Sequence, residues 1–561
     1  MSNSTNTESV YEEIFEFRLV AAIDFGTTYS GYAYSFHDDP LTFFCPQTWY
    51  AGQGNLSSLK TPTCLLLNPD QSFNSFGYAA ENKYVHLASE GKHLDYYFFM
   101  RFKMDLHWKD MTHDTEINDV TGKGLPAILV FSSSIKYLKD HLFQTLEDRG
   151  HTVETSQILF VLTVPAIWTE SAKQFMRTAA VQAGVHTNQL VYKTATRKYA
   201  FKITSFLNIQ FKKCGTADFS VHEVNEDGTL TEIHMATGGP YAGTIVDEEY
   251  LKLYSKIFGY KTMQKLKAND MEEYLAIARN FETKKRLVCE EYMESFNVKL
   301  ATTLSKRFKS KPKKFKKNIA EIGMKDFISI DGDKIKFAPS AIKSLFCTPV
   351  GGIVSHIQNL LKEHEEVKSI LLVGGFSESR LLQEEIKKAI VDKTFVIPNE
   401  CGLAVLKGAV LYGHRPLSIT ARIMKYTYGV ASDSIFKEGI HPNTRKYKDE
   451  NGEFRCKRSF SILIAKGTKV STTGVEIIRT SEPITTTQMS VAERVYYTDK
   501  ENPVVVDENC KLLKGYKLSL PENNGKPRIV KSIFTFGLTE MKYRSEVIET
   551  GIQTEGTLDL L

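Results

Sequence analysis

The sequence LVAAIDFGTTYSGYAYSF, at residues 19–36, is the stretch that decides the fold. It begins with the apolar run 19–23, which is typical of a buried strand, and Asp24 follows as an acid at the end of that strand. The segment 29–36 then alternates aromatic and small side chains along its second half, which predicts another strand. Only residues 25–28 separate the two strands, so the stretch predicts a tight hairpin.

The turn between these strands has the composition of a phosphate site. Gly26 lets the backbone turn sharply and lets a ligand approach it closely. Thr27 and Thr28 add hydroxyl donors and free backbone N–H groups, which suit phosphate oxygens. Together with Asp24, these residues predict a cradle for phosphate and Mg²⁺. The alternative is an ordinary hairpin, which this turn alone does not exclude.

The composition is that of a large globular protein. The chain has 561 residues, too many for one compact core, so we expect two or more domains. A net charge of +5 is too small to indicate nucleic-acid or membrane binding by itself, and no apolar run is long enough to span a bilayer. The eight cysteines include no C-x-x-C pair, and the first residues lack the features of a signal peptide. We therefore expect a cytoplasmic protein, with the nucleus as a second location, and a disordered tail at 1–17.

Residues 206–224 predict a second hairpin with related turn chemistry. Its Gly215 and Thr216, followed by Asp218, echo the glycine, threonine and acid of the first turn. The two hairpins lie about 190 residues apart, which suggests an internal duplication with a period too long for a solenoid.

Two further glycine-rich loops precede helices. Gly243 lies in the loop 238–244, and a loop of this kind at a helix N-terminus favours anions, although such loops are common. Gly374 and Gly375 follow an apolar strand, and Ser377 is expected to cap the next helix. These positions predict additional places where a ligand approaches the backbone.

The cations of two segments have alternative interpretations. Lys103 and Arg101 lie within reach of a bound phosphate, or they extend their charged ends to solvent from an aromatic strand or helix, which their spacing favours. The run KRFKSKPKKFKK at 306–317 suits nucleic acid, acidic lipid or an import receptor, but a flexible solvated insertion is the favoured interpretation. Pro312 argues against a continuous helix there.

The order of the remaining elements predicts an α/β core followed by a β-rich region. A buried strand at 158–164 leads into a helix that Thr169 is able to cap, and 127–146 reads as an amphipathic helix. Beyond the core, short strand-like runs alternate with turn residues, and no long helix follows. We therefore expect the core at 18–415 and a β-rich domain at 416–561.

In this order and spacing, the motifs resemble the actin-like ATPase superfamily. Within it they resemble the 70-kDa heat-shock chaperones and their divergent 12A and 12B branch, over about residues 18–430. Five motifs carry the resemblance. They are a first phosphate loop (24–30), a connecting segment (163–166), a remnant of the second phosphate loop (215–218), an adenosine motif (373–377) and the start of the β-rich region (422–430). A predicted helix at 271–292 falls where the adenosine-contacting helix of this family lies, and its charged residues are alternatively a solvated face with charge pairs.

The resemblance implies a duplicated actin-like ATPase fold of the α/β class, in which lobes at 18–205 and 206–415 enclose a cleft for ATP or ADP with Mg²⁺. It implies that Asp24 faces the metal through a water molecule, and that Asp24, Asp218 and Lys103 are the catalytic candidates. The implied nucleotide-binding residues are Gly26, Thr27, Thr28, Tyr29, Gly215, Thr216, Gly243, Glu282, Lys285, Arg286, Gly374, Gly375 and Ser377.

The sequence departs from the family at the second phosphate loop. The family has an acid and three glycines there, whereas this chain has Phe211 at the acid position and Lys213 and Cys214 at the first two glycine positions. The acid-Pro-x-Ala-Ala stretch of the family is replaced by KTATR at 193–197. Because an acid that helps to hold Mg²⁺ or the attacking water is missing, we expect very slow ATP hydrolysis or none.

The expected function is that of a chaperone-like ATP-binding protein. Closure of the lobes on the nucleotide would be relayed to the β-rich domain, with protein clients or partners and without nucleic-acid binding. The alternative is a degenerate relative that serves as a non-hydrolysing interaction or scaffold protein. A small-molecule kinase of the same superfamily fits worse, because no base beside an acceptor site is evident in the sequence.

Overall fold

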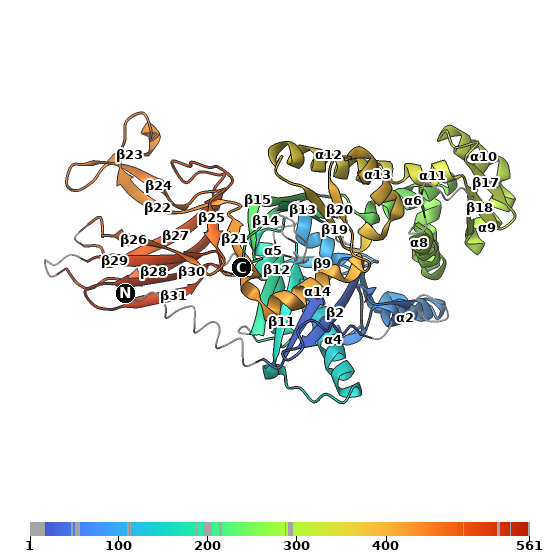
Figure 1. The fold of residues 1–561 in the computed structure, drawn as a ribbon, viewed down its shortest axis with the longest axis horizontal. Helices are drawn as coiled ribbons and strands as arrows, with labels where there is room; N and C mark the ends of the chain where they lie inside the picture. Colours follow the sequence, from blue (N-terminus) through green and yellow to red (C-terminus); the bar gives the residue numbers. More distant parts are fainter. Residues whose placement is uncertain are drawn as a thin grey trace.

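The computed structural model describes the greater part of the chain, which forms a mixed α/β part and, beside it, a part built of strands (Figure 1). The described residues are 17–46, 49–50, 57–108, 111–112, 114–165, 167–186, 189–194, 205–211, 216–285, 288–289, 295–485, 487–523, 528–538 and 540–558. Apart from Phe17, the predicted tail 1–17 lies outside them.

The stretch 19–36 forms the centre of the first sheet. The strands of this sheet are β1 (Leu19–Asp24), β2 (Tyr29–Phe36), β5 (Thr61–Pro62), β11 (Ile158–Val164) and β12 (Leu190–Thr194), in the order β12-β11-β1-β2-β5. β1 is antiparallel to β2 and parallel to β11, and β11 is parallel to β12. The predicted hairpin and the predicted strand at 158–164 are confirmed.

A second sheet follows the same plan. Its strands are β13 (Ser205–Phe211), β14 (Ala217–Val224), β15 (Leu230–Gly239), β19 (Ser369–Val373), β20 (Thr394–Val396), β21 (Ile419–Ile423) and β25 (Lys469–Ser471), in the order β20-β19-β13-β14-β15-β21-β25. β13 is antiparallel to β14 and parallel to β19, and β19 is parallel to β20. Each sheet thus contains a hairpin whose first strand is extended by two parallel strands.

One helix packs between the two sheets, and others cover their outer faces. α14 (Cys401–His414) contacts β1, β11 and β19, and its Leu406 is buried in a core with Val161 and Leu371. The first sheet is covered by α4 (Ala127–Asp148) and α5 (Glu170–Gln182). The second is covered by α6 (Gly243–Phe258), α12 (Cys347–Glu363) and α13 (Arg380–Ala389). As predicted, Thr169 caps α5, since its hydroxyl accepts from the N–H of Ala172 at 3.2 Å.

Beyond the second sheet, the described chain forms two stacked antiparallel sheets. One contains β22 (Thr427–Ile435), β23 (Lys446–Lys448), β24 (Phe454–Ile464), β27 (Ser490–Thr498) and β28 (Lys511–Ser519). The other contains β26 (Val475–Ser481), β29 (Val530–Phe536), β30 (Lys542–Val547) and β31 (Gln553–Thr557). Tyr428 and Val495 of the first pack with Phe534 of the second in one core. β21 and β25, which follow the predicted boundary at 416, instead belong to the second sheet of the α/β part.

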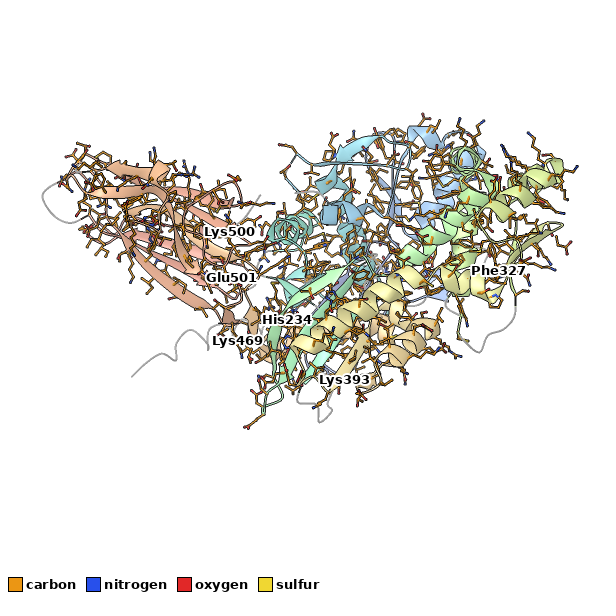
Figure 2. The ribbon with its side chains drawn as sticks, turned by 90° about the horizontal axis from the view of Figure 1, so that it is seen from above. His234, Phe327, Lys393, Lys469, Lys500 and Glu501 are labelled. Atoms are coloured by element: carbon orange, nitrogen blue, oxygen red, sulfur yellow. The ribbon has the colours of Figure 1, made fainter. Side chains whose placement is uncertain are left out.

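The basic run lies in a helical region at the end of the molecule far from the C-terminal strands, near Phe327 in Figure 2, whereas Lys500 and Glu501 mark those strands. The predicted solvated character of the run 306–317 is confirmed, because all its lysines are exposed, but the run is helical. The run forms most of α9 (Thr302–Ser310) and α10 (Pro312–Glu321), and Phe315 with Ile319, four residues later, is buried. The predicted break at Pro312 is confirmed, because this residue begins α10.

Two helix ends also differ from the prediction. α8 (Met271–Lys285) is shorter than the predicted 271–292, and after it the carbonyl of Val288 accepts from the N–H of Leu381 at 3.3 Å. Ser377 lies within a short 3-10 helix, and the next residue but one, Ser379, caps α13 by accepting from the N–H of Leu382. None of the helices in the described part of the chain combines the length and the apolar composition that crossing a bilayer requires.

The close approach of β13 and β19 depends on Gly374, which suggests a test. Gly374 has a φ of 94°, and a Cβ there would lie 1.8 Å from the carbonyl oxygen of Phe211. We expect Gly374→Ala to lower the free energy of unfolding by at least about 2 kcal/mol, measured by urea denaturation, because strain and a backbone clash add. Gly351→Ala is the control, since no neighbouring atom lies within 4 Å of its Cβ position and alanine favours a helix. Equal stability of the two variants would contradict this account of the junction.

Candidate functional site

Three adjoining cavities meet around the turn after β1, and Tyr29 borders all of them. The inner cavity, of about 420 Å³, lies at the carboxyl ends of four strands and is bordered there by Asp24, Thr163, Phe211 and Gly374. The outer cavity, of about 470 Å³, and the side cavity, of about 680 Å³, continue from it. The carboxyl ends of parallel strands are where open α/β sheets bind ligands.

Asp24 is held in the inner cavity by two other segments. Its Oδ2 accepts a hydrogen bond from Lys60 Nζ at 2.6 Å, and its Oδ1 accepts one from Thr163 Oγ1 at 2.6 Å. The side chains of Lys60 and Asp24 are only 8% and 21% exposed. Burial raises the pKa of Asp24, but Lys60 and the two hydrogen bonds outweigh it and lower the pKa to about 2. Asp24 is therefore an ionised carboxylate with both oxygens engaged.

A second buried cation borders the same cavity. Lys103 is 3% exposed and donates a hydrogen bond to the carbonyl oxygen of Phe25. Its Nζ also lies 4.8 Å from the ring centroid of Trp168. The interpretation that Lys103 extends to solvent is wrong, because aromatic rings and backbone enclose its charge. Among the described residues that border the inner cavity, two ammonium groups thus face one carboxylate.

Phe211 occupies the end of β13, the position at which the resemblance places the acid of the family. Its side chain is fully buried, and its ring packs edge-on against that of Phe376, with 5.8 Å between centroids. The preceding residue, Gln210, is also buried and borders the inner cavity. Within the described residues, this wall of the cavity therefore offers an amide and an aromatic ring where the family has a carboxylate.

The outer cavity contains a buried charge cluster. Lys285 Nζ lies 2.6 Å from Asp247 Oδ1 and also pairs with Glu282 on the same helix. It donates a further hydrogen bond to the carbonyl oxygen of Gly243, the first residue of α6, at 3.2 Å. Burial raises the pKa of Asp247, against the lowering effect of Lys285. The charge pair between Glu282 and Lys285 exists as the alternative interpretation supposed, but it is buried and faces the cavity instead of forming a solvated face.

The side cavity is bounded by a contact between α2 (Tyr78–Ser89) and α8. Arg279 of α8 forms an ion pair with Glu81 of α2, and both border the cavity. Met271 and Leu275 of α8 are buried in one core with Tyr84 of α2. This contact joins the side of the first sheet to the side of the second.

Most of the predicted site residues come together around these cavities. Those bordering the inner cavity are Asp24, Gly26, Tyr29, Lys103, Gly374 and Gly375. Those bordering the outer or side cavity are Thr27, Thr28, Gly243, Glu282 and Lys285. Thr216, Asp218 and Ser377 are buried but border none of the three cavities. Gly215 and Arg286, with Lys213 and Cys214, lie outside the described residues.

The site contains residues that the sequence did not reveal, among them Lys60, Thr163, Gln210, Asp247 and Phe346. Thr163 lies inside a motif that was recognised, but its contact with Asp24 joins positions 139 residues apart. Asp247 follows Gly243 by one helical turn, so its spacing was a usable signal for a shared face. Lys60 lies in a segment without periodicity, and only its contact with Asp24 reveals its role.

The pairing of Lys60 with Asp24 leads to an expectation about stability. We expect Lys60→Met to lower the free energy of unfolding at pH 7 by about 3–5 kcal/mol, because it leaves a buried carboxylate without its main partner. Since the pKa of Asp24 is lowered, its contribution is present above a pH of about 3.8 and is lost as the pH falls towards 2. The difference between wild type and variant, measured by urea unfolding, should therefore shrink below pH 4.

The double variant Asp24→Asn with Lys60→Met is the control for this expectation. It removes both charges, so its loss of stability should be smaller than the sum of the two single losses. Additive losses would show that the two groups do not interact energetically.

Comparison with known proteins places these features in a family. No protein-family model matches the chain. Heat shock 70 kDa protein 12A of Mus musculus is 30% identical, over 100% of this chain and 94% of that protein. The Homo sapiens protein of the same name is 30% identical, over 99% and 93%. Heat shock 70 kDa protein 12B of Homo sapiens is 29% identical, over 97% and 91%. Because the similarity spans nearly the whole of each protein, the chain belongs to the family of heat shock 70 kDa proteins 12A and 12B.

Proposed function

We propose that this protein binds ATP and ADP in the three adjoining cavities and hydrolyses ATP very slowly or not at all. The observation that carries the proposal is the inner cavity itself. It brings the turn after β1, with Gly26, together with Gly374 and Gly375 after β19, and adds two buried lysines. The ammonium groups suit the phosphates of a nucleotide, and the glycines allow those phosphates to approach the backbone closely.

We further propose that the two sheets are the lobes of a duplicated actin-like ATPase fold. Their repeated strand order supports this, since the hairpins β1-β2 and β13-β14 occupy equivalent positions. In this proposal the lobes extend over 18–205 and 206–415, with β21 and β25 completing the second sheet, and the other strands within 416–561 form an interaction domain. The membership of the 12A and 12B family is in keeping with it.

The outer cavity is the proposed place for the adenosine. Phe346 and Phe376 provide aromatic surface there, with 6.3 Å between their ring centroids. Asp247 and Glu282 provide carboxylate oxygens that accept hydrogen bonds, as the hydroxyl groups of a ribose require. The phosphates then extend past Tyr29, which borders both cavities, towards Lys103.

The described residues of the inner cavity do not fit a magnesium ion held by the protein. Mg²⁺ takes oxygen ligands in octahedral geometry, commonly one or two carboxylates with waters and phosphates. Asp24 is the one carboxylate among the described lining residues, and Lys60 and Thr163 already engage its oxygens. The surplus of positive charge favours an anion instead. Magnesium therefore enters this proposal only as a counterion of the nucleotide.

Slow hydrolysis is expected because Phe211 stands in the wall of the inner cavity where the family has an acid. A positioned base or water-orienting group contributes about 10²- to 10⁴-fold to a rate. Phe211 is unable to act in that role, and its ring is packed into the core. Lys60 and Lys103 stabilise phosphate charge in this proposal, but an ammonium ion does not accept the proton of a water molecule.

A chaperone-like role, with protein clients or partners, is proposed from the family membership. A non-hydrolysing interaction or scaffold protein is the second candidate function. Two observations favour it. Phe211 stands where the family has a carboxylate, and the carboxylate of Asp24 is already paired with Lys60, so neither is available to assist hydrolysis. Binding of nucleotide separates a nucleotide-holding protein from an empty fold, and measurable turnover separates a slow ATPase from a binding module.

Binding is tested by titrating the full chain with ATP in a calorimeter, once with Mg²⁺ and once with EDTA. We expect binding in both, with dissociation constants that differ by less than about tenfold, because lysines supply the positive charge. Lys103→Met should weaken binding at least about tenfold, since a hydrogen bond to a charged group contributes about 1.5–3 kcal/mol.

Lys123→Met is the matched control for the binding test. Lys123 also donates to backbone carbonyls and lies 4.2 Å from an aromatic ring centroid, that of Tyr97, but borders none of the three cavities. Gly26→Val is unsuitable, because a Cβ at Gly26 would lie 2.1 Å from the carbonyl oxygen of Tyr29. Absence of heat in both buffers would refute nucleotide binding. Binding only with Mg²⁺ would leave nucleotide binding standing but refute the proposal that the lysines supply the positive charge.

Hydrolysis is tested by single turnover with radiolabelled ATP beside an ordinary 70-kDa heat-shock chaperone. We expect a rate at least about 10²-fold lower, in line with the missing acid. A comparable rate that Asp24→Asn abolishes would show that another group has replaced the missing acid. A melting curve of Asp24→Asn is needed as the control, because this variant leaves Lys60 buried without its partner.

A further inference from the structure

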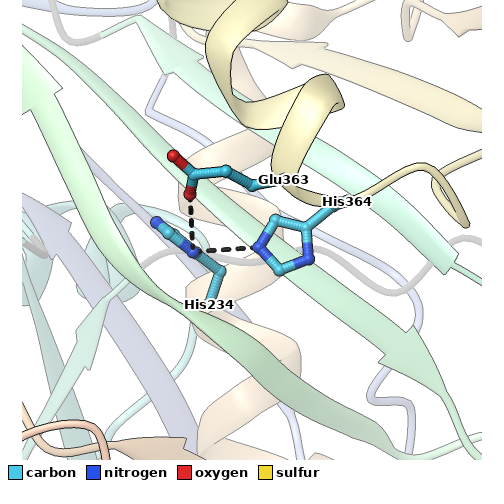
Figure 3. A group of neighbouring side chains, drawn as sticks. All are labelled: His234, Glu363 and His364. Atoms are coloured by element: carbon cyan, nitrogen blue, oxygen red, sulfur yellow. Dashed lines mark hydrogen bonds and ion pairs between the residues drawn. The ribbon is translucent and has the colours of Figure 1, made fainter.

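A compact group of metal-binding side chains lies outside the three cavities. His234 comes from β15, whereas Glu363 and His364 come from the C-terminal end of α12, and the three side chains converge (Figure 3). His234 Nδ1 lies 2.9 Å from His364 Nε2 and 3.9 Å from Glu363 Oε2. One donor atom from each residue fits within 4.8 Å of the other two. None of these residues borders the inner, outer or side cavity.

The orientation of His364 is the one found in metal sites. Its Nδ1 faces Glu366 Oε1 at 3.0 Å, so this carboxylate accepts the ring N–H and Nε2 points towards His234. A histidine that binds a metal almost always donates its other N–H to such a partner, which sets its tautomer. The lone pair of His364 Nε2 therefore points towards His234 Nδ1, so the two rings meet through ring nitrogens.

We propose that His234, Glu363 and His364 bind a zinc ion. Zn²⁺ takes imidazole nitrogens at about 2.0–2.1 Å and carboxylate oxygens at about 2.0–2.2 Å in tetrahedral geometry. Donors at these distances lie about 3.3 Å apart, so the observed 2.9 and 3.9 Å require only small side-chain movements. Two imidazoles and a carboxylate are a ligand set that zinc uses, with water in the fourth position.

The solvent exposure of the three side chains agrees with a zinc site whose fourth ligand is water. The side chains of His234 and His364 are 22% and 16% exposed, so protein encloses most of both rings. Glu363 is 63% exposed, and its side chain has room to rotate onto the metal. The zinc ion would tie the end of α12 to β15, two segments that the chain separates by more than a hundred residues. In Figure 2, His234 lies beside the long helix α12 on the surface of the second sheet.

The test is a calorimetric titration of the chelator-treated full chain with zinc chloride. We expect one zinc ion per chain at this site, with affinity at least about tenfold lower in His364→Ala and in Glu363→Gln, because each removes a ligand. Zinc should also raise the melting temperature of the wild type and not that of His364→Ala. Co²⁺ in place of zinc should give the visible absorption of a tetrahedral site without a thiolate charge-transfer band.

His86→Ala is the matched control. His86 forms an exposed pair with Glu90, with 3.2 Å between Nε2 and Oε1, and belongs to no three-ligand group among the described residues. Its zinc affinity should equal that of the wild type. Glu363→Gln keeps the test decisive if His364→Ala fails to fold, since Glu363 is largely exposed. Unchanged affinity in both ligand variants, no saturable uptake of one zinc ion, or a thiolate band with Co²⁺ would overturn the proposal.

Discussion

The buried ion pair between Lys60 and Asp24 is the interaction on which the cleft depends. Asp24 ends β1, Lys60 immediately precedes β5, and Thr163 lies near the end of β11, so one carboxylate joins three segments of the first sheet. Burying these charges is costly, and the attraction offsets the cost only because the geometry is close and the oxygens are hydrogen-bonded. The inner cavity therefore contains a fixed cation, Lys60, beside Asp24, and Lys103 adds a second positive charge.

The elements that the sequence predicts well are those with local signals. The strand at 158–164 is an unbroken apolar run, and its observed bounds agree with the prediction residue by residue. The turn at Asp24 and Gly26 combines an apolar strand, an acid and a residue without a side chain within a few positions. Gly374 and Gly375 were found in the same way. Most of the site could be predicted because its ligand-facing backbone lies at the ends of such strands.

The rest depends on contacts that no local pattern records. Lys60 approaches Asp24 across 36 residues, and Lys285 of α8 meets Asp247 of α6 across 38 residues. The basic run at 306–317 carries charge typical of a solvated segment, yet one apolar face is sufficient to fold it against the core. The local composition of a segment therefore indicates its solvent exposure, whereas its contacts with distant segments determine its secondary structure.

The contact between α2 and α8 would control how fast a nucleotide leaves, if one binds as proposed. Arg279 of α8 pairs with Glu81 of α2, and Leu275 of α8 is buried in the same contact. The two helices therefore close one side of the side cavity. Parting them would break the ion pair and expose the apolar surface of Leu275. The residence time of the nucleotide would then depend on the rate at which α2 and α8 separate. A protein that binds α2 or α8 and separates them would accelerate exchange without contacting the nucleotide.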